Sequence, residues 1–304
     1  MALLLTHDDV KPLLDLERAI AVTEQVFHEY GRGEVDVHAP YHLLVREGAL
    51  RVVSGALKES RRMGLRCGPT HGPPEGHVAL LYASDGTLRA IMGYSFGTIR
   101  TAATVAASLK HMARPDAKRV GLIGTGANAL GLLHGARAVR PVSQIFVYSR
   151  DGERRRRFAE EAARAVGVSV TAAGSAREAV AGMDIVITST SNREPLFPFD
   201  WLDKGTHLSS MGPISELGAD IFLNCDRRVV SSKAQEENYY IKTPPFPLVE
   251  LIAAGRLQWS DVDELGEVIA GTRPGRAGTD EITLFHESQG GFGDMAFASF
   301  VYTE

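Results

Sequence analysis

Residues 120–139 read VGLIGTGANALGLLHGARAV, and this stretch decides the fold. A short apolar run leads into a glycine-containing turn and then into a helical pattern that begins at the small residue Ala129. The turn consists of Gly124, Thr125, Gly126, Ala127 and Asn128. In a strand–turn–helix unit of this kind, the first glycine permits the tight turn and the second lets a pyrophosphate approach the backbone, while the helix N-terminus offers amides and a positive dipole. The stretch therefore predicts a dinucleotide-binding site at the turn, with a purely structural βα turn as the alternative.

The strand that follows this unit should end in the residues that select the cofactor. Residues 144–148 read QIFVY and lead into Ser149 and Arg150. An acidic residue at this place binds the ribose 2′-hydroxyl, whereas an arginine accommodates a 2′-phosphate. A hydroxyl and a guanidinium favour NADP(H). Asp151, one residue further, could still bind the ribose of NAD(H), so NAD(H) is the alternative cofactor. The four arginines of residues 154–157 are interpreted as a solvated helix face rather than as a phosphate site.

The pattern of the chain changes at residues 114–116 (Arg-Pro-Asp), which end an alanine-rich helical segment. Before this point, a helix over residues 8–31 is followed by short extended segments, and the Asp-Gly pair at residues 85–86 signals a hairpin. After it, short apolar runs alternate with helical patterns, which is typical of a parallel sheet with helices on both faces. We therefore expect a mostly antiparallel first part and an α/β part behind the boundary.

Composition narrows the function classes. The chain has 304 residues, of which 44% are hydrophobic and 23% charged, values that suit two globular domains. Its formal net charge of −4 gives no general attraction to nucleic acid or anionic membranes, and no run approaches the ~18 to 20 apolar residues of a membrane span. The two cysteines, Cys67 and Cys225, have no metal-ligand spacing. We therefore expect a cytoplasmic protein that binds no metal, nucleic acid or membrane.

Two arginines lie where an anionic partner is expected. Arg100 and Thr101 stand near the start of the alanine-rich helix, a place that suits a carboxylate or a phosphate. Arg66 interrupts an apolar strand and is followed by His71, and a guanidinium that points inward from such a strand needs an anion. Taken alone, each cluster favours a structural role slightly.

The order of these motifs resembles the ornithine cyclodeaminase/μ-crystallin family from about residue 8 to the C-terminus. The matching segments are the arginine-bearing strand, the Asp-Gly hairpin, the RTAA helix start, MARPDA, IGTGA, DIVITST, a strand that ends in Gly212, and the terminal TLFHESQGGFGDMA. The resemblance implies a nicotinamide cofactor, hydride transfer at an amino-acid carbon, and a homodimer. It also implies that a Rossmann-type doubly wound parallel sheet (residues 116–279) is inserted in an α+β substrate-binding and dimerisation domain (residues 1–115 plus 280–304).

The resemblance further implies roles for single residues. Arg100 and Thr101 would contact cofactor phosphate or substrate carboxylate, and the turn at residues 124–128 would hold the pyrophosphate. The residues expected along the path to the nicotinamide ring, or close to the ring, are Ser189, Thr190, Met211, Gly212 and Ser288.

Three departures from the family pattern argue against cyclodeamination of ornithine. Arg66 stands where the cyclodeaminases carry a lysine, and residues 35–38 lack the arginine of their preceding strand region. Their catalytic aspartate follows the glycine of a strand near the cofactor, whereas here Gly212 is followed by Pro213. Arg66 can bind a carboxylate through two hydrogen bonds, but it cannot transfer a proton because an arginine stays charged at neutral pH.

We therefore expect an NAD(P)H-dependent imine or ketimine reductase, or an amino-acid dehydrogenase, that acts on a small carboxylate-bearing substrate. Arg66 and Arg100 are the candidates for binding the carboxylate. The candidate catalytic residues are Arg66, His71 and Asp294, with His38 as a further candidate for the proton donor. The alternatives are an ammonia-releasing amino-acid cyclodeaminase and a non-catalytic NADPH- or ligand-binding protein of the μ-crystallin type.

Overall fold

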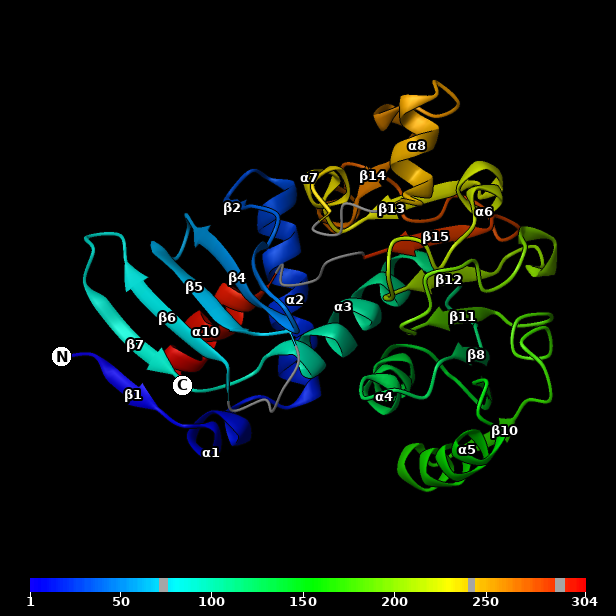
Figure 1. Cartoon of the computed structure of the whole chain (residues 1–304), viewed down its shortest axis with the longest axis horizontal. Coiled ribbons are helices and arrows are strands. Elements are labelled where there is room, and N and C mark those ends of the chain that lie inside the picture. The colour runs from blue at the N-terminus through cyan, green and yellow to red at the C-terminus, as the bar shows by residue number, and fades with distance from the viewer. Residues whose placement is uncertain (71–75, 240–243, 288–292) are drawn as a thin grey trace.

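The computed structural model of the chain describes residues 1–70, 76–239, 244–287 and 293–304, which form two β-sheets with helices between and around them (Figure 1). The helices in these residues are α1 (His7–Val10), α2 (Leu16–Gly31), α3 (Gly97–Met112), α4 (Ala129–Val139), α5 (Gly152–Val166), α6 (Ala219–Asn224), α7 (Lys233–Glu237), α8 (Pro247–Ala253), α9 (Leu265–Ile269) and α10 (Asp294–Thr303). Short 3₁₀ turns are η1 (Lys11–Leu13), η3 (Phe199–Trp201) and η4 (Trp259–Asp261). The strands are β1 (Leu3–Leu5), β2 (Val35–Val37), β3 (Tyr41–Val45), β4 (Gly48–Leu57), β5 (Arg62–Pro69), β6 (Val78–Ala83), β7 (Leu88–Met92), β8 (Arg119–Ile123), β9 (Gln144–Tyr148), β10 (Ser169–Ala172), β11 (Ile185–Thr188), β12 (His207–Ser210), β13 (Arg227–Val230), β14 (Asp263–Glu264) and β15 (Thr283–His286).

The first sheet is antiparallel except at one edge, and the described residues give it seven strands. Its order is β1-β7-β6-β5-β4-β2 with β3 also paired to β4, and β1 runs parallel to β7. The predicted Asp-Gly hairpin joins β6 and β7. Gly86 has a φ of 84°, a left-handed backbone conformation that is strained for residues with a side chain. Asp85 Oδ1 accepts a hydrogen bond from the Thr87 N–H at 2.9 Å. Helix α10 packs against β4, β5 and β6 on one face of this sheet (Figure 1).

The N-terminal helical segment is interrupted, so the prediction of one helix over residues 8–31 was wrong. The turn η1 contains Pro12, and α2 begins anew after Asp15. The backbone of Asp15 is extended (φ −84°, ψ 170°), and its carboxylate accepts a hydrogen bond from the Arg18 N–H at 2.8 Å. An aspartate in this position caps a new helix, and this local preference overrides the helical spacing of the apolar residues.

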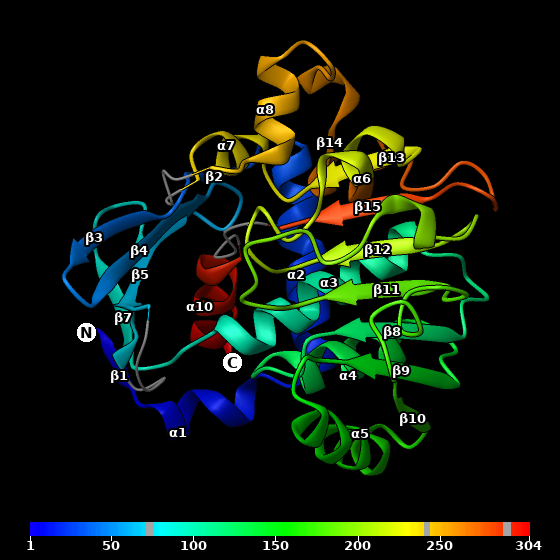
Figure 2. The same ribbon diagram turned by 45° about the vertical axis from the view of Figure 1, so that its right-hand side comes forward.

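The second sheet has eight strands within the described ranges, all parallel, in the order β10-β9-β8-β11-β12-β15-β13-β14 (Figure 2). The chain moves outward from β8 through β9 to β10 and then returns to the other side of β8 at β11. This is the order of a doubly wound nucleotide-binding sheet, and its switch point lies between β8 and β11. The predicted α/β class with a Rossmann-type parallel sheet is therefore confirmed.

Helix α3 contributes to the cores of both sheets. Its Ala103 and Ala106 belong to the core beside the first sheet, whereas Val105 and Leu109 belong to the core beside the second. The two sheets are therefore packed around one shared helix rather than joined only by linkers. Helices α2 and α3 have 16 residues each, and no helix in the described part of the chain is both long and apolar enough to cross a membrane.

Strand β15 lies in the terminal segment TLFHESQGGFGDMA, for which the sequence indicated no strand. It lies between β12 and β13, and its four residues are all buried. Four residues are too few to show a periodicity, which explains why the strand was missed. Because β15 follows residue 279, we propose that the Rossmann domain extends beyond the expected boundary and that the chain returns to the first domain only after β15.

Candidate active site

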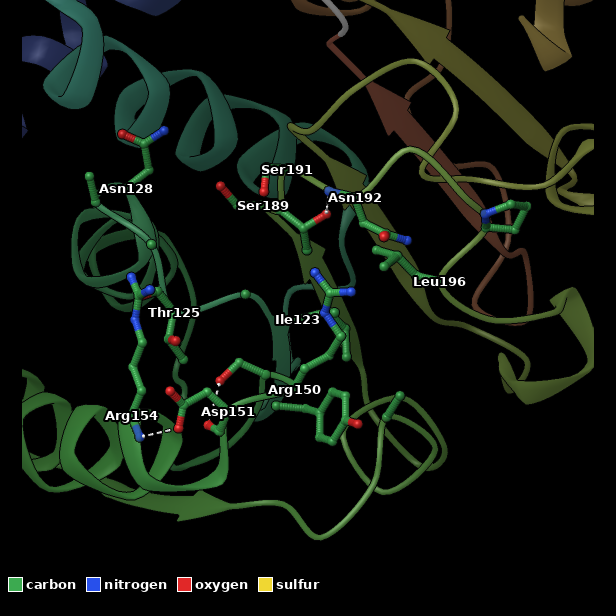
Figure 3. Close-up of a pocket in the computed structure, with 18 residues that line it drawn as sticks. Ile123, Thr125, Asn128, Arg150, Asp151, Arg154, Ser189, Ser191, Asn192 and Leu196 are labelled. Carbon is green, nitrogen blue, oxygen red and sulfur yellow. Dashed lines mark hydrogen bonds between the residues drawn. The ribbon is translucent and has the colours of Figure 1, made fainter. Parts of the chain in front are cut away.

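A cavity of about 680 Å³ opens at the carboxyl ends of β8, β9 and β11, which is the switch point of the parallel sheet (Figure 3). Its volume lies within the roughly 300–1,000 Å³ of small-molecule and cofactor pockets. The residues assigned to the cofactor from the sequence that lie on its walls are Gly124, Thr125, Gly126, Ala127, Asn128, Ser149, Arg150, Ser189 and Thr190. Ligands of open α/β sheets bind in this crevice, so the location agrees with the predicted dinucleotide site.

The two glycines of the turn have different tasks. Gly124 has a φ of 112°, and a Cβ there would lie 2.2 Å from the Ser189 carbonyl oxygen, so this position needs a glycine for the fold itself. A Cβ at Gly126 would meet no heavy atom within 4 Å and would point into open space on the cavity wall. The Asn128 side chain makes no capping hydrogen bond to α4. No side chain therefore caps α4, and its N-terminus lies beside the glycine turn, as in a pyrophosphate-binding turn.

The wall beyond β9 carries two guanidinium groups. Figure 3 shows Arg150 extending from the end of β9 toward the segment that holds Asn192, and Arg154 beside Thr125. Arg154 donates a hydrogen bond to the Thr125 carbonyl oxygen at 2.9 Å. Asp151 accepts hydrogen bonds from the N–H groups at the start of α5, and that from Arg154 is the main cause of its lowered pKa.

Residues 154–157 were interpreted as a solvated face, and Arg154, Arg156 and Arg157 are indeed exposed. Two of the four arginines also have contacts that this interpretation did not include. Arg154 lines the cavity, and the guanidinium of Arg155 lies 5.0 Å from the ring centre of Tyr148. The first helical turn after β9 faces the cofactor crevice, and the position of the arginines in that turn was the available signal.

Glu216 is a buried residue of this region that the sequence did not reveal. Its carboxylate accepts hydrogen bonds from the hydroxyl groups of Thr188 (2.6 Å), Thr190 (2.8 Å) and Ser210 (2.8 Å), and from the Gly212 N–H (2.9 Å). A Cβ at Gly212 would lie 2.0 Å from the same carboxylate. Glu216 thus connects the ends of β11 and β12, and the acceptors of its carboxylate are occupied by the protein itself.

Asp294, the first residue of α10, lies between the two arginines that were singled out in the sequence. Its carboxylate accepts a hydrogen bond from Arg66 Nε at 2.5 Å and one from Arg100 Nη1 at 2.7 Å, and all three side chains are buried. Burial alone would raise the pKa of Asp294, but the Arg100 and Arg66 guanidinium groups lower it to about 2. Asp294 is therefore ionised at neutral pH, so its geometry suits the orientation of Arg66 and Arg100 rather than proton donation.

His77 completes the contacts of Arg66. Its Nδ1 lies 2.7 Å from Arg66 Nη1, and because a guanidinium can only donate, Nδ1 is the acceptor and carries no proton. Burial and the nearby Arg66 lower the pKa of His77, which keeps the ring neutral. The prediction from the sequence favoured His71 and His38 instead.

Arg51 and Glu287 extend this cluster and were also missed. The pairs Val53–Arg66 and Arg51–Gly68 in the β4–β5 ladder place Arg51 and Arg66 on the same face of the first sheet. Burial, together with Arg100 and Arg66, lowers the pKa of Arg51 to about 10. Glu287 directly follows β15, and its buried carboxyl group lies in the electrostatic field of Arg100 and Arg51.

The remaining predicted residues are not all part of the cluster. The Thr101 hydroxyl donates to the Gly97 carbonyl oxygen of its own helix at 2.8 Å. His38 has a side chain that is 80% exposed and lies 3.7 Å from Asp36. Met211 follows β12, where its N–H donates to the Thr188 carbonyl oxygen at 2.9 Å. His71 and Ser288 lie outside the described residues.

Known proteins are similar to this chain in sequence and in fold. The profile of the ornithine cyclodeaminase/mu-crystallin family matches residues 1–304. A Delta(1)-pyrroline-2-carboxylate reductase of Bacillus cereus is 32% identical over 235 residues, which cover 75% of this chain and 70% of that protein.

Two solved structures cover nearly the whole chain. The Delta(1)-pyrroline-2-carboxylate reductase of Thermococcus litoralis, in complex with NADH and L-proline, is similar with a TM-score of 0.87 and 27% identity, covering 99% of this chain and 96% of that one. An archaeal alanine dehydrogenase dimer with bound NAD is similar with a TM-score of 0.86 and 26% identity, covering 99% of this chain and 95% of that one.

Proposed function

The chain belongs to the ornithine cyclodeaminase/mu-crystallin family, and we propose that it reduces the C=N bond of a small imine that carries a carboxylate. It is an NAD(P)-dependent oxidoreductase of the imine reductase and amino-acid dehydrogenase type. One observation supports the assignment most directly: Ser210 connects the cofactor crevice to the arginine cluster. Its hydroxyl donates to Glu216 below the crevice, and its carbonyl oxygen accepts from the N–H of Glu287, which faces Arg100.

Different residues of the site bind the cofactor and the substrate. When bound, a reduced nicotinamide supplies a hydride to the imine carbon. The turn at residues 124–128 holds the pyrophosphate of the cofactor, and Met211 and Gly212 lie close to the nicotinamide ring. Arg66 and Arg100 hold the substrate carboxylate, and Asp294 fixes both guanidinium groups in place.

We also propose that NADP(H) is preferred over NAD(H). Arg150 and Arg154 stand on the cavity wall where a 2′-phosphate would lie, with the Ser149 hydroxyl beside them. Asp151, which would bind the ribose of NAD(H), uses its carboxylate to cap α5. The structural relatives described above were solved with NADH and NAD, so only the residues of this chain support the proposed preference.

The exposed face of the first sheet supports a homodimer. Large apolar side chains that are at least 39% exposed lie on the neighbouring strands β3, β4 and β5, on the face opposite to Arg66: Tyr41, Leu43, Val45, Leu50 and Met63. Monomeric proteins rarely leave such a continuous apolar patch uncovered. A second copy of the chain would cover it.

We also propose a reducing, cytoplasmic location, since Cys67 and Cys225 are both free thiols.

Three assays on the wild-type protein test the function. Oxidation of NADPH in the presence of a cyclic imine carboxylate, or of a 2-keto acid with an amine, is the expected result. Release of ammonia from a diamino acid without net consumption of cofactor would identify a cyclodeaminase instead. Tight NADPH binding with neither reaction would identify a binding protein.

A further inference from the structure

Reduction of an imine needs a proton as well as a hydride, and the residues of the arginine cluster are poor donors. Arg66 and Arg100 stay charged, and the pKa of Asp294, near 2, leaves no proton on it at neutral pH. His77 accepts a hydrogen bond from Arg66 at Nδ1, so it would have to break that bond to become an imidazolium acid. Among the described residues, another group at this edge of the sheet is therefore the candidate for the proton donor.

Glu287 is placed where such a group is needed. It follows β15 directly, and its N–H donates to the Ser210 carbonyl oxygen at 3.0 Å, so it lies beside the chain that continues to Met211 and Gly212. The residue is 3% exposed, and within the described residues Glu287 Oε2 has no hydrogen-bond partner. A buried carboxylate without a partner is costly, whereas a protonated carboxyl group waits for an acceptor such as a substrate nitrogen.

We propose that Glu287 is the proton donor of the reaction and that its free oxygen points to the nitrogen of the substrate. This assignment rests on the proposed imine reduction. The hydride forms the new C–H bond with its own electron pair, and the π electrons of the C=N bond move to nitrogen. That electron pair takes the proton of Glu287, so an N–H bond forms as the O–H bond breaks. A proton from water then restores the carboxyl group.

The charges around Glu287 agree with this role. Among the described residues, the charges that act most strongly on Glu287 belong to Arg100 on α3, Arg51 on β4, Asp294 on α10 and the preceding His286. Burial raises the pKa of Glu287 more than Arg100 and Arg51 lower it. The acid form is therefore present below this raised pKa and is lost as the pH increases through it. The same arginines would stabilise the carboxylate that remains after proton transfer.

The test compares the wild type with Glu287→Gln and Glu287→Asp, using NADPH and one cyclic imine carboxylate over a range of pH. We expect Glu287→Gln to lower kcat/KM by roughly 10²- to 10⁴-fold, the usual contribution of a general acid, and to abolish the fall in rate at alkaline pH. Glu287→Asp should recover part of the rate and keep the alkaline limb. The dissociation constants of NADPH and of a carboxylate inhibitor should change less than threefold. An infrared band of a protonated carboxyl group should disappear in Glu287→Gln.

Glu281→Gln is the matched control, because Glu281 lies before the opposite end of β15 and its carboxylate pairs with Arg227. It should leave kcat/KM and its pH profile unchanged. If the fall in rate at alkaline pH persists in Glu287→Gln, it reports the titration of the substrate nitrogen. If kcat/KM of that variant is also within threefold of the wild-type value, the assignment of Glu287 is overturned, while the proposed function stands. If Glu287→Gln does not fold, a Glu287→Asp enzyme that lacks the alkaline limb would overturn it. If the wild type fails to oxidise NADPH with any of the imine carboxylates tested, the proposed function and the assignment are overturned together.

Discussion

At the scale of single residues, the charge balance of the arginine cluster depends on the buried carboxylate of Asp294. Asp294 has two guanidinium partners, from β5 and from α3, and no exposure to solvent. A carboxylate in this position has to stay ionised, because a proton on it would leave Arg66 and Arg100 as neighbouring buried cations. Asp294 therefore connects β5 and α3 of the first domain and fixes the positions of both guanidinium groups.

This arrangement makes stability depend on pH. The pKa of Asp294 falls from 3.8 to about 2 on folding, a difference worth about 2 kcal/mol of stability. Because the folded pKa is the lower one, the stabilisation is present above the unfolded value and is lost as the pH decreases toward 2. We expect Asp294→Asn to lower the free energy of unfolding by at least about 2 kcal/mol at pH 7, and the loss to shrink between pH 4 and pH 2.

Urea unfolding at several pH values measures this effect. Asp280→Asn is the control, since Asp280 is 79% exposed and lies 4.0 Å from Lys204, and it should change stability by less than about 0.5 kcal/mol. A loss for Asp294→Asn that is the same at pH 7 and pH 3 would contradict the account.

A second prediction at this scale concerns the cofactor. Arg150→Ala should weaken NADPH binding by about 1 to 3 kcal/mol, roughly 5- to 150-fold, and leave NADH binding nearly unchanged. The matched control is Arg157→Ala, an exposed arginine of α5 that is not among the described residues lining the cavity. Fluorescence titration of both cofactors measures the effect. Equal affinity of the wild type for NADPH and NADH would contradict the preference and would indicate Asp151 as the ribose ligand.

At the scale of elements, the turn between β8 and α4 allows two glycines to be separated by experiment. Gly126→Val should abolish NADPH binding while the melting temperature stays within a few degrees, because the new side chain projects into the cavity and meets no protein atom. Gly124→Val should destabilise the fold itself, because its Cβ would collide with the Ser189 carbonyl oxygen. Calorimetry with and without NADPH distinguishes the two. A stable Gly126→Val protein with normal NADPH affinity would show that the turn is only structural.

Elements that depend on local chemistry could be predicted from the sequence, and elements that depend on distant partners could not. The Asp-Gly hairpin and the glycine turn follow from backbone preferences of their own residues, and the structure has both. The break before Asp15 also has local signals, Pro12 and the capping aspartate, but the helical spacing of the apolar residues favoured one continuous helix. Strand β15 exists because β12 and β13 provide its hydrogen bonds, and no short sequence records that. Arg51 and Glu287 were missed for the same reason, since only the tertiary fold brings them to Arg100.

At the scale of the whole molecule, the site lies where the two sheets meet. The first domain supplies Arg66 and Arg100, the parallel sheet supplies the cofactor crevice and Glu287, and α3 contributes to both cores. A shift of one domain relative to the other would separate the arginines from the crevice. We propose that the shared helix, which carries Arg100, keeps the carboxylate of the substrate at a constant distance from the cofactor.

The apolar face of the first sheet gives a prediction for the assembly. Light scattering should give twice the 32.9 kDa of one chain at micromolar concentration. Leu43→Asp should shift the mass toward that of one chain, because Leu43 lies opposite Leu50 on the apolar face with 49% of its surface exposed. Arg157→Asp, on the surface of α5, should not. A wild type that scatters as a single chain would contradict the homodimer.

The central claim is that the crevice and the arginine cluster form one site, and a crystal structure with NADP⁺ and a cyclic amino-acid product tests it most directly. We predict the pyrophosphate on residues 124–128, the product carboxylate on Arg66 and Arg100, and the product nitrogen within hydrogen-bond distance of Glu287. A product bound away from both arginines, or a dinucleotide outside the crevice, would contradict the account.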